Sequence, residues 1–263
     1  MDLLLKGKIA LISGSSAGLG FATAQQLVQE GAVVIINGRD KKRLSDAKEN
    51  LDAIPGAQVI AIAGDVSTTD FATKVVNEIE YHFGGLDILI TNAGGPPAGG
   101  LDDFSDEVWQ NAINSTFLSH LRLIRAAKPL LLKSETPSIL TITSAAVKQP
   151  MPNMILSNSI RAATVGLTKT LANELGPAGV RVNSILPGWT DTERVHKLMQ
   201  TRATKNNTSV DEEYHQQALE SPLRRIGKPE EFARTAAFLV SPAASYIHGV
   251  MLVVDGGLNK GLF

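Results

Sequence analysis

A glycine-rich segment near the N-terminus, residues 13–20 (SGSSAGLG), combines residue types that could hold a phosphate group. It separates a short aliphatic run from a helix-like stretch. Glycines at such a junction let the backbone turn tightly and approach a pyrophosphate, whose charge lies at the N-terminus of the helix. The spacing Gly-x-x-x-Gly-x-Gly also suits an ordinary turn, but its place between a strand and a helix favours a nucleotide site.

Further polar or turn-forming groups stand where other aliphatic runs end. Asn92, Ser144 and the pair at 187–188 (Pro-Gly) each close such a run. Asn-Ala-Gly and Pro-Gly are ordinary strand-end turns, an interpretation that can hold together with a role in binding a ligand.

The elements that would position these groups alternate along the chain. Short runs rich in Ile, Val, Leu and Ala are expected as strands at 8–13, 33–37, 58–63, 86–92, 138–144, 180–186 and 250–255. Longer stretches are expected as helices at 19–30, 41–51, 68–83, 106–133, 155–175 and 229–239. The runs are nearly continuous rather than alternating, as expected for strands covered on both faces. The pattern predicts an α/β fold with a parallel sheet of about seven strands and right-handed crossovers.

One segment, residues 192–221, does not fit this alternation. It is polar and able to form helices, and it lies beyond the carboxyl end of a strand, where mobile lids occur. We expect it to be a helical lid over the ligand crevice. No linker rich in Pro, Gly or Ser divides the chain, so residues 1–263 are expected to form a single domain.

Composition excludes several classes of function. The 263 residues are 43% hydrophobic and carry a formal net charge of -1. This charge indicates no excess of basic residues that would bind nucleic acid or a membrane surface. Cysteine is absent, the five histidines lack metal-ligand spacing, and no metal site is expected. Ser144 lacks the Gly-x-Ser-x-Gly context of a hydrolase nucleophile. With no apolar run of roughly 20 residues and a short start (MDLLLK), we expect a cytoplasmic protein.

The ordered set of motifs resembles the short-chain dehydrogenase/reductase family, in particular β-ketoacyl carrier-protein reductases. Residues 13–20 match its glycine fingerprint, with Ser13 where threonine is usual. The other matching segments are Asp65-Val66, Asn92-Ala93-Gly94, Asn183 with Pro187-Gly188 and Thr192, residues 222–231 and residues 255–257. The likeness covers essentially the whole chain. It implies a Rossmann-type, doubly wound sheet, dinucleotide-dependent oxidoreductase activity on a small carbonyl or alcohol substrate, and a homotetramer.

The resemblance also implies roles for individual residues. It assigns the pyrophosphate to Gly14, Gly18, Leu19 and Gly20, adenine to Asp65 and Val66, the adenosine ribose region to Asn92, Ala93 and Gly94, and the nicotinamide to Pro187, Gly188 and Thr192.

The end of the second run, residues 36–40 (INGRD), bears on the choice of cofactor. Gly38 stands where NAD-preferring relatives carry an acidic residue that binds the free ribose hydroxyl. Arg39 offers a planar cation suited to a 2′-phosphate, and Ser16 offers a hydroxyl donor. Arg39 could instead lie over adenine, as arginine does in NAD binders. We expect NADP(H) to be favoured over NAD(H).

The family's proton chemistry uses a Tyr-x-x-x-Lys pair on one helix face, a serine that orients the carbonyl and an asparagine in a proton relay. Ser144 matches the serine, but the tyrosine, lysine and asparagine positions are Ser157, Arg161 and Thr116. A serine hydroxyl is a far weaker acid than a phenol, whose pKa is ~10. Arginine stays cationic and could bind a ribose hydroxyl of the cofactor, but it is planar and longer than lysine.

Other groups could supply the missing proton. His196 follows Thr192 by one helical turn, Tyr214 lies further along the predicted lid, and Lys148 lies just past the fifth run. Each is also compatible with an ordinary surface residue, and water is a further source.

Two hypotheses remain open. The first is an NADP-dependent oxidoreductase with an atypical proton relay, in which Ser144 holds the carbonyl. The second is a non-catalytic dinucleotide-binding protein that acts as a sensor or a scaffold. Loss of the tyrosine and the lysine favours the second, whereas retention of the glycine segment and Ser144 favours the first.

Overall fold

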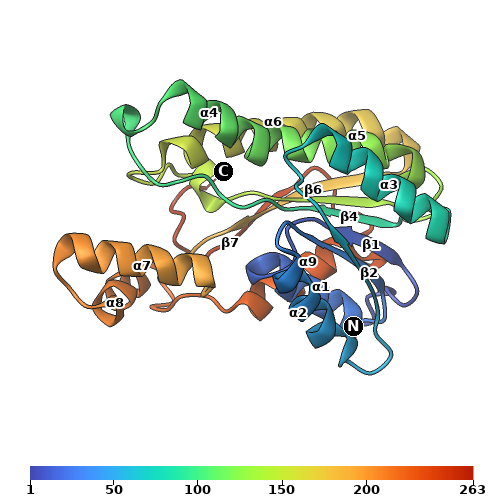
Figure 1. Cartoon of the computed structure of the whole chain (residues 1–263), viewed down its shortest axis with the longest axis horizontal. Coiled ribbons are helices and arrows are strands. Elements are labelled where there is room, and N and C mark those ends of the chain that lie inside the picture. The colour runs from blue at the N-terminus through green and yellow to red at the C-terminus, as the bar shows by residue number, and fades with distance from the viewer. Residues whose placement is uncertain (263) are drawn as a thin grey trace.

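The predicted strands form one parallel sheet in a computed structural model that describes residues 1–262 (Figure 1). The strand order is β3-β2-β1-β4-β5-β6-β7. The strands are β1 (Ile9–Ile12), β2 (Val33–Gly38), β3 (Gln58–Ala63), β4 (Ile88–Thr91), β5 (Ser138–Ile142), β6 (Arg181–Pro187) and β7 (Met251–Val254). Their ends differ from the predicted ends by no more than two residues. The order reverses between β1 and β4, which opens a crevice at their carboxyl ends.

Helices cover both faces of the sheet (Figure 1). One layer contains α3 (Thr69–Phe83), α4 (Asp106–Ile113), α5 (Ser119–Leu131) and α6 (Ile155–Leu175). The other contains α1 (Gly18–Gln29), α2 (Lys41–Asp52) and α9 (Pro229–Val240). Short 3-10 turns occur at Leu101–Asp103, Ala145–Val147, Gly176–Ala178 and Pro242–Ala244. This is the Rossmann-type, doubly wound α/β fold that the sequence predicts.

The core explains why the strand runs are continuously apolar. Side chains of a strand point alternately to opposite faces, and here both faces are buried. Leu11 and Ile35 pack with α3 and α5 on one side, whereas Ile12 and Ile36 pack with α1 and α9 on the other. Such strands need apolar residues at every position, and period-two patterning is absent for that reason.

The stretch predicted as one helix at 106–133 is divided in the structure. A π turn, Asn114–Leu118, lies between α4 and α5. A π turn widens the helix by one residue, which changes the face on which all later side chains lie. The buried Thr116 belongs to this turn, and its carbonyl oxygen accepts a hydrogen bond of 3.2 Å from Thr164 Oγ1 on α6.

The predicted lid is a helical hairpin. It consists of α7 (Glu193–Asn206) and α8 (Val210–Glu220), and it projects from the sheet beside the start of α6 (Figure 1). Thr192 caps α7, because its side chain accepts a hydrogen bond from the backbone N–H of Val195. Among residues 1–262, no helix has the length and apolar character needed to cross a membrane.

Candidate active site at the carboxyl edge of the sheet

The glycine-rich segment forms a tight loop between β1 and α1. Gly14 and Gly18 both have φ of +58°, a conformation that side chains with a Cβ rarely adopt. A Cβ on Gly20 would lie 2.3 Å from the carbonyl oxygen of Gly14. The loop is tied to β4, because Asn92 Nδ2 donates to that same oxygen at 2.9 Å. Ser13 links the same two segments, because its Oγ donates a hydrogen bond to Asn92 O and accepts one from Asn92 N–H.

The start of α1 is suited to a pyrophosphate. Its N-cap, Ala17, has no side chain that can accept a hydrogen bond from the first helical turn. The N–H groups of that turn and the positive end of the helix dipole therefore face the cleft without a protein partner from the cap. Gly18 and Leu19 line the cleft at this point. The loop fits the phosphates of a dinucleotide.

The end of β2 shapes the adenosine side. A Cβ on Gly38 would lie 2.7 Å from Ser16 Oγ, so an acidic side chain at this position requires Ser16 to move. Arg39 is exposed and points toward Asp65, with 3.7 Å between Arg39 Nη1 and Asp65 Oδ2. Arg39, Ser16, Asp65 and Val66 line one broad cavity of ≈ 1000 Å³.

Asp65 is held as a carboxylate at this end of the cleft. Burial alone would raise its pKa, but hydrogen bonds from Ser67 and the charge of Arg39 outweigh burial and lower the pKa. The Ser67 backbone N–H and Oγ donate to Asp65 Oδ1 at 2.9 and 2.8 Å. The other carboxylate oxygen, Oδ2, faces Arg39. Asp65 therefore presents a hydrogen-bond acceptor at the position that the resemblance assigns to adenine.

The end of the cleft next to β5 and α6 contains three of the predicted catalytic side chains. Ser144, Ser157 and Arg161 line one cleft of ≈ 550 Å³ together with Gly14, Gly18 and Leu19 of the loop. The same cleft is bordered by Asn92, Ala93, Gly94, Pro187, Gly188 and Thr192. Ser144 caps the turn after β5, because its Oγ accepts from the Ala146 N–H at 3.1 Å. Within residues 1–262 its own O–H donates to no protein group, and a hydroxyl can donate as well as accept.

Arg161 stands at the position where the family carries a lysine, and its cationic side chain is buried. Its residue is 8% exposed, and Nη1 donates to the carbonyl oxygens of Ile142 at 3.2 Å and Thr143 at 2.6 Å. Burial and the charge of Arg194 lower its pKa to about 10. At neutral pH the guanidinium is therefore protonated, and it is anchored to the end of β5 next to Ser144.

Thr116 does not line this cleft. Its side chain is fully buried in the π turn, and its Oγ1 lies 3.5 Å from Ser115 Oγ. The structure thus brings together Ser144, Ser157 and Arg161 in one cleft, whereas Thr116 is buried where the π turn packs against α6.

The proposed substitute proton donors also lie elsewhere. None of His196, Tyr214 and Lys148 lines the cavities that residues 1–262 form at this edge. Tyr214 donates to Asp191 Oδ1 at 3.0 Å, and burial together with that carboxylate raises its pKa to about 12. His196 Nε2 is exposed and lies 3.1 Å from Gln200 Nε2. Lys148 is exposed beyond the turn after β5.

A buried histidine behind the cleft was not predicted from the sequence. His120 on α5 is 2% exposed, and its Nδ1 lies 2.6 Å from Thr91 Oγ1 at the end of β4. Among residues 1–262, its Nε2 has no hydrogen-bond partner. Burial, followed by the charge of Arg161, lowers its pKa to about 3. The imidazole is therefore neutral at neutral pH. The one sequence signal was a histidine on the inward face of an amphipathic helix.

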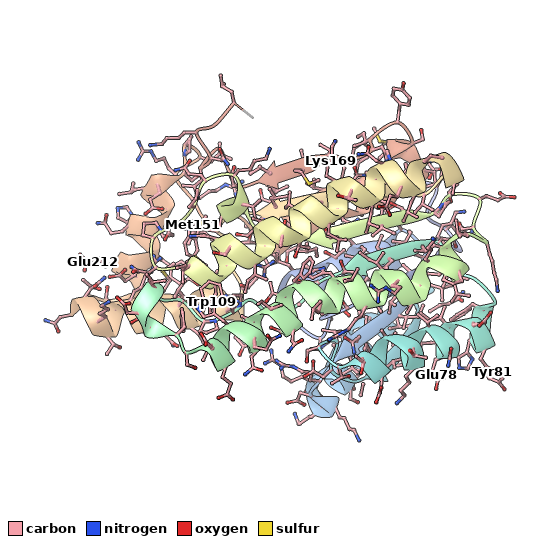
Figure 2. All side chains as sticks on the ribbon, turned by 90° about the horizontal axis from the view of Figure 1, so that it is seen from above. Glu78, Tyr81, Trp109, Met151, Lys169 and Glu212 are labelled. Atoms are coloured by element: carbon pink, nitrogen blue, oxygen red, sulfur yellow. The ribbon has the colours of Figure 1, made fainter. Side chains whose placement is uncertain are left out.

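A second cavity adjoins the cleft on the hairpin side. It has a volume of ≈ 580 Å³, and Met151, Met154 and Trp189 line both spaces. Met151 lies in the loop before α6, near the hairpin (Figure 2). Arg202 of α7 lies 5.1 Å above the ring of Trp189. The two cavities together offer room for a cofactor and a small substrate.

Comparisons with known proteins agree with this geometry. A family profile described as enoyl-(acyl carrier protein) reductase matches residues 14–259. Human dehydrogenase/reductase SDR family member 4 is 33% identical over 260 residues, which cover 98% of this chain and 90% of that protein. The chain belongs to the short-chain dehydrogenase/reductase family. It is thus a member of a family of oxidoreductases.

Other members cover the whole chain. The uncharacterized oxidoreductase YvrD of Bacillus subtilis is 34% identical over 266 residues and 100% of both chains. L-sorbose reductase from Gluconobacter frateurii, solved with NADPH and L-sorbose, is 33% identical, covers 100% of both chains and superposes with a TM-score of 0.95. YwfH, an NADPH-dependent reductase involved in bacilysin biosynthesis, is 30% identical over 98% of this chain and 100% of that chain, with a TM-score of 0.92.

Proposed function

We propose that this chain is an NADP(H)-dependent oxidoreductase that interconverts a carbonyl group and an alcohol in a small molecule. The observation that carries the proposal is one continuous cleft, which joins Gly14 and Gly18 of the loop to Ser144 and Arg161. A cofactor held by the loop supplies hydride transfer, so the protein has only to bind and polarise the carbonyl beside it.

Ser144 and Arg161 are suited to polarising a carbonyl. The Ser144 hydroxyl accepts from Ala146 N–H and keeps its own proton for a substrate oxygen. Arg161 adds a fixed positive charge on the same side of the cleft. Donors and charges fixed in advance stabilise negative charge that develops on oxygen during the reaction. They do so without the phenol that the family normally uses.

Water is the proton source in this proposal. Among residues 1–262, the cleft is lined by no tyrosine or histidine, and Arg161 does not release a proton at neutral pH. The cleft is open to solvent at the hairpin side, where it meets the second cavity at Met151 and Trp189. The hairpin α7–α8 acts as the lid over the substrate.

Two residues support NADP(H) over NAD(H). Arg39 is exposed at the ribose end and can contact a 2′-phosphate, while the place of an acidic residue is taken by Gly38, packed on Ser16. L-sorbose reductase, solved with NADPH, and the NADPH-dependent reductase YwfH, 33% and 30% identical, agree with this choice.

The second candidate is a nucleotide-binding sensor or scaffold without turnover. It is favoured by Ser157 and Arg161 at the two positions where the family carries its proton donor and lysine.

Turnover separates the two candidates. Purified protein is mixed with NADPH and a panel of small ketones, diketones and oxo acids, and the loss of NADPH absorbance is followed. We expect slow but measurable reduction, which Ser144→Ala lowers about 100-fold, because one transition-state donor is lost. Ser45→Ala, on the exposed side of α2, is the matched control. Tight NADPH binding without any turnover would support the sensor or scaffold instead.

A further inference from the structure

Arg161 is a buried cation without a carboxylate partner. Arginine side chains are seldom buried unless an anion compensates their charge. Among residues 1–262, no carboxylate forms an ion pair with Arg161, nor with Arg194, which is exposed. Two backbone carbonyl oxygens neutralise Arg161 only in part, because they carry partial charges.

The guanidinium of Arg161 also has donors left over. Both of its hydrogen bonds to protein, to Ile142 O and Thr143 O, use Nη1. Nε and Nη2 are left for a ligand in the cleft that Arg161 lines with Ser144. A planar pair of parallel N–H donors matches the two oxygens of a carboxylate.

A second arginine approaches the same cleft from the hairpin. Arg194 lies in the first turn of α7, and its Nη2 donates to Pro96 O at 3.0 Å. Its guanidinium lies against Gly95, where a side chain would collide with it. It borders the same space as Arg161, and the two charges are close enough that Arg194 lowers the pKa of Arg161. The result is a positive region at the reacting end of the cleft.

We propose that the reducible substrate carries a carboxylate, bound by Arg161 and Arg194 next to Ser144. The substrate class is therefore a small oxo acid, an inference that rests on the reductase function proposed above. The anion proposed for Arg161 and Arg194 is not the cofactor's pyrophosphate, because the pyrophosphate is assigned to the loop at residues 13–20 and the N-terminus of α1. Arg161 and Ser157 lie on α6, and they line the same cleft as Ser144, which lies in the turn after β5.

Matched substrate pairs test this assignment. Pyruvate is compared with methyl pyruvate, and acetoacetate with methyl acetoacetate, each with saturating NADPH. Hydrogen bonds to a charged group contribute about 1.5–3 kcal/mol, so we expect kcat/KM of the acid to exceed that of its ester by about 10-fold or more. Equal values for acid and ester would overturn the substrate class and leave the reductase function intact.

Arg194→Met adds a second readout. We expect it to raise KM for the oxo acid by about 10-fold and to change KM for the ester and the Kd of NADPH by a clearly smaller factor. Arg234→Met, which removes an exposed arginine from α9 in the opposite layer, is the charge-matched control. An equal loss of NADPH affinity in Arg194→Met would show that Arg194 binds the cofactor's phosphates, and would contradict its role here.

Binding of an unreactive carboxylate distinguishes failure of the two proposals. Oxamate is titrated into the protein–NADPH complex, and the fluorescence of the bound cofactor is followed. Saturable binding that weakens about 10-fold in Arg194→Met supports the carboxylate site even if no substrate turns over, in which case only the reductase function fails. No oxamate binding together with equal reduction of acids and esters overturns the inference alone.

Discussion

Ser144, Ser157 and Arg161 define the proton chemistry that the cleft can perform. A phenol next to a lysine can both donate a proton and recover it at neutral pH, whereas a serine hydroxyl cannot. What the three side chains do provide is a hydrogen-bond donor, a second hydroxyl and a fixed charge. Such groups polarise a carbonyl but do not replace the acid, so the reaction proposed above requires a proton from water and an electrophilic substrate.

His120 should make stability depend on pH. Its pKa is lowered to about 3 in the folded protein, from an ordinary value of about 6.5. The unfolded chain therefore binds a proton first as the pH falls, and stability is lost progressively between about pH 6.5 and pH 3. At pH 5 the loss is about 2 kcal/mol.

The measurement is denaturant unfolding at pH 7 and pH 5. The decrease in unfolding free energy should be about 2 kcal/mol larger in the wild type than in His120→Asn, which keeps a hydrogen bond to Thr91 without a titrating ring. His215→Asn, at an exposed position of α8, should behave like the wild type. Equal pH dependence in wild type and His120→Asn would show that the imidazole is not held neutral.

Single-residue roles were predictable where a motif fixes the spacing. The roles of the glycines at 13–20 and of Ser144 follow from the motifs that the resemblance matches, and the structure brings Gly14, Gly18 and Ser144 into one cleft. His120 and Arg194 were not predictable in this way. His120 meets Thr91 across 29 residues, and Arg194 meets Pro96 across 98. Contacts of this kind depend on how helices are rotated against the sheet, which hydrophobic periodicity does not specify.

At the level of elements, the loop between β1 and α1 has little tolerance for an added side chain. A Cβ on Gly20 would lie 2.3 Å from Gly14 O, so Gly20→Ala must displace the loop backbone. We expect an increase of about 10-fold or more in the Kd of NADPH and a loss of about 1–3 kcal/mol in stability. Fluorescence titration and denaturant unfolding measure the two effects.

Gly85→Ala is the control for this prediction. Its Cβ would lie 3.9 Å from Lys133 Cβ, and the position is at the opposite end of β4 from the cleft. Nucleotide affinity should be unchanged in this variant. An unchanged Kd in Gly20→Ala would contradict the assignment of the loop to the pyrophosphate.

Element types were largely predictable, whereas their local irregularities were not. Continuous aliphatic runs predict the seven strands because the sheet is buried on both faces. The π turn at Asn114–Leu118 has no such signal. The π turn adds one residue to a single helical turn. The hydrophobic pattern on either side of it still resembles that of one long helix.

At the scale of the whole molecule, the candidate site lies where the strand order reverses, between β1 and β4. The cleft crosses the carboxyl edge of the sheet, between the layer of α1 and the layer of α6, with the hairpin at one end (Figure 1). Beyond the cleft, partly buried apolar side chains gather where α4 meets α6, among them Trp109 (Figure 2). A homotetramer packed through the helices at 106–133 and 155–175, which the resemblance implies, and a cytoplasmic location stay predictions.

The central claim, an NADP(H) site in this cleft, is tested most directly by fluorescence titration of the purified protein with NADPH and, separately, with NADH. We expect both nucleotides to bind saturably. From the positions of Arg39 and Gly38 we expect the Kd of NADPH to be about 10-fold lower than that of NADH, because the arginine contacts a phosphate that NADH lacks. Equal affinity would contradict the preference for NADP(H). Failure to bind either nucleotide would contradict the cofactor site itself and, with it, the proposed function.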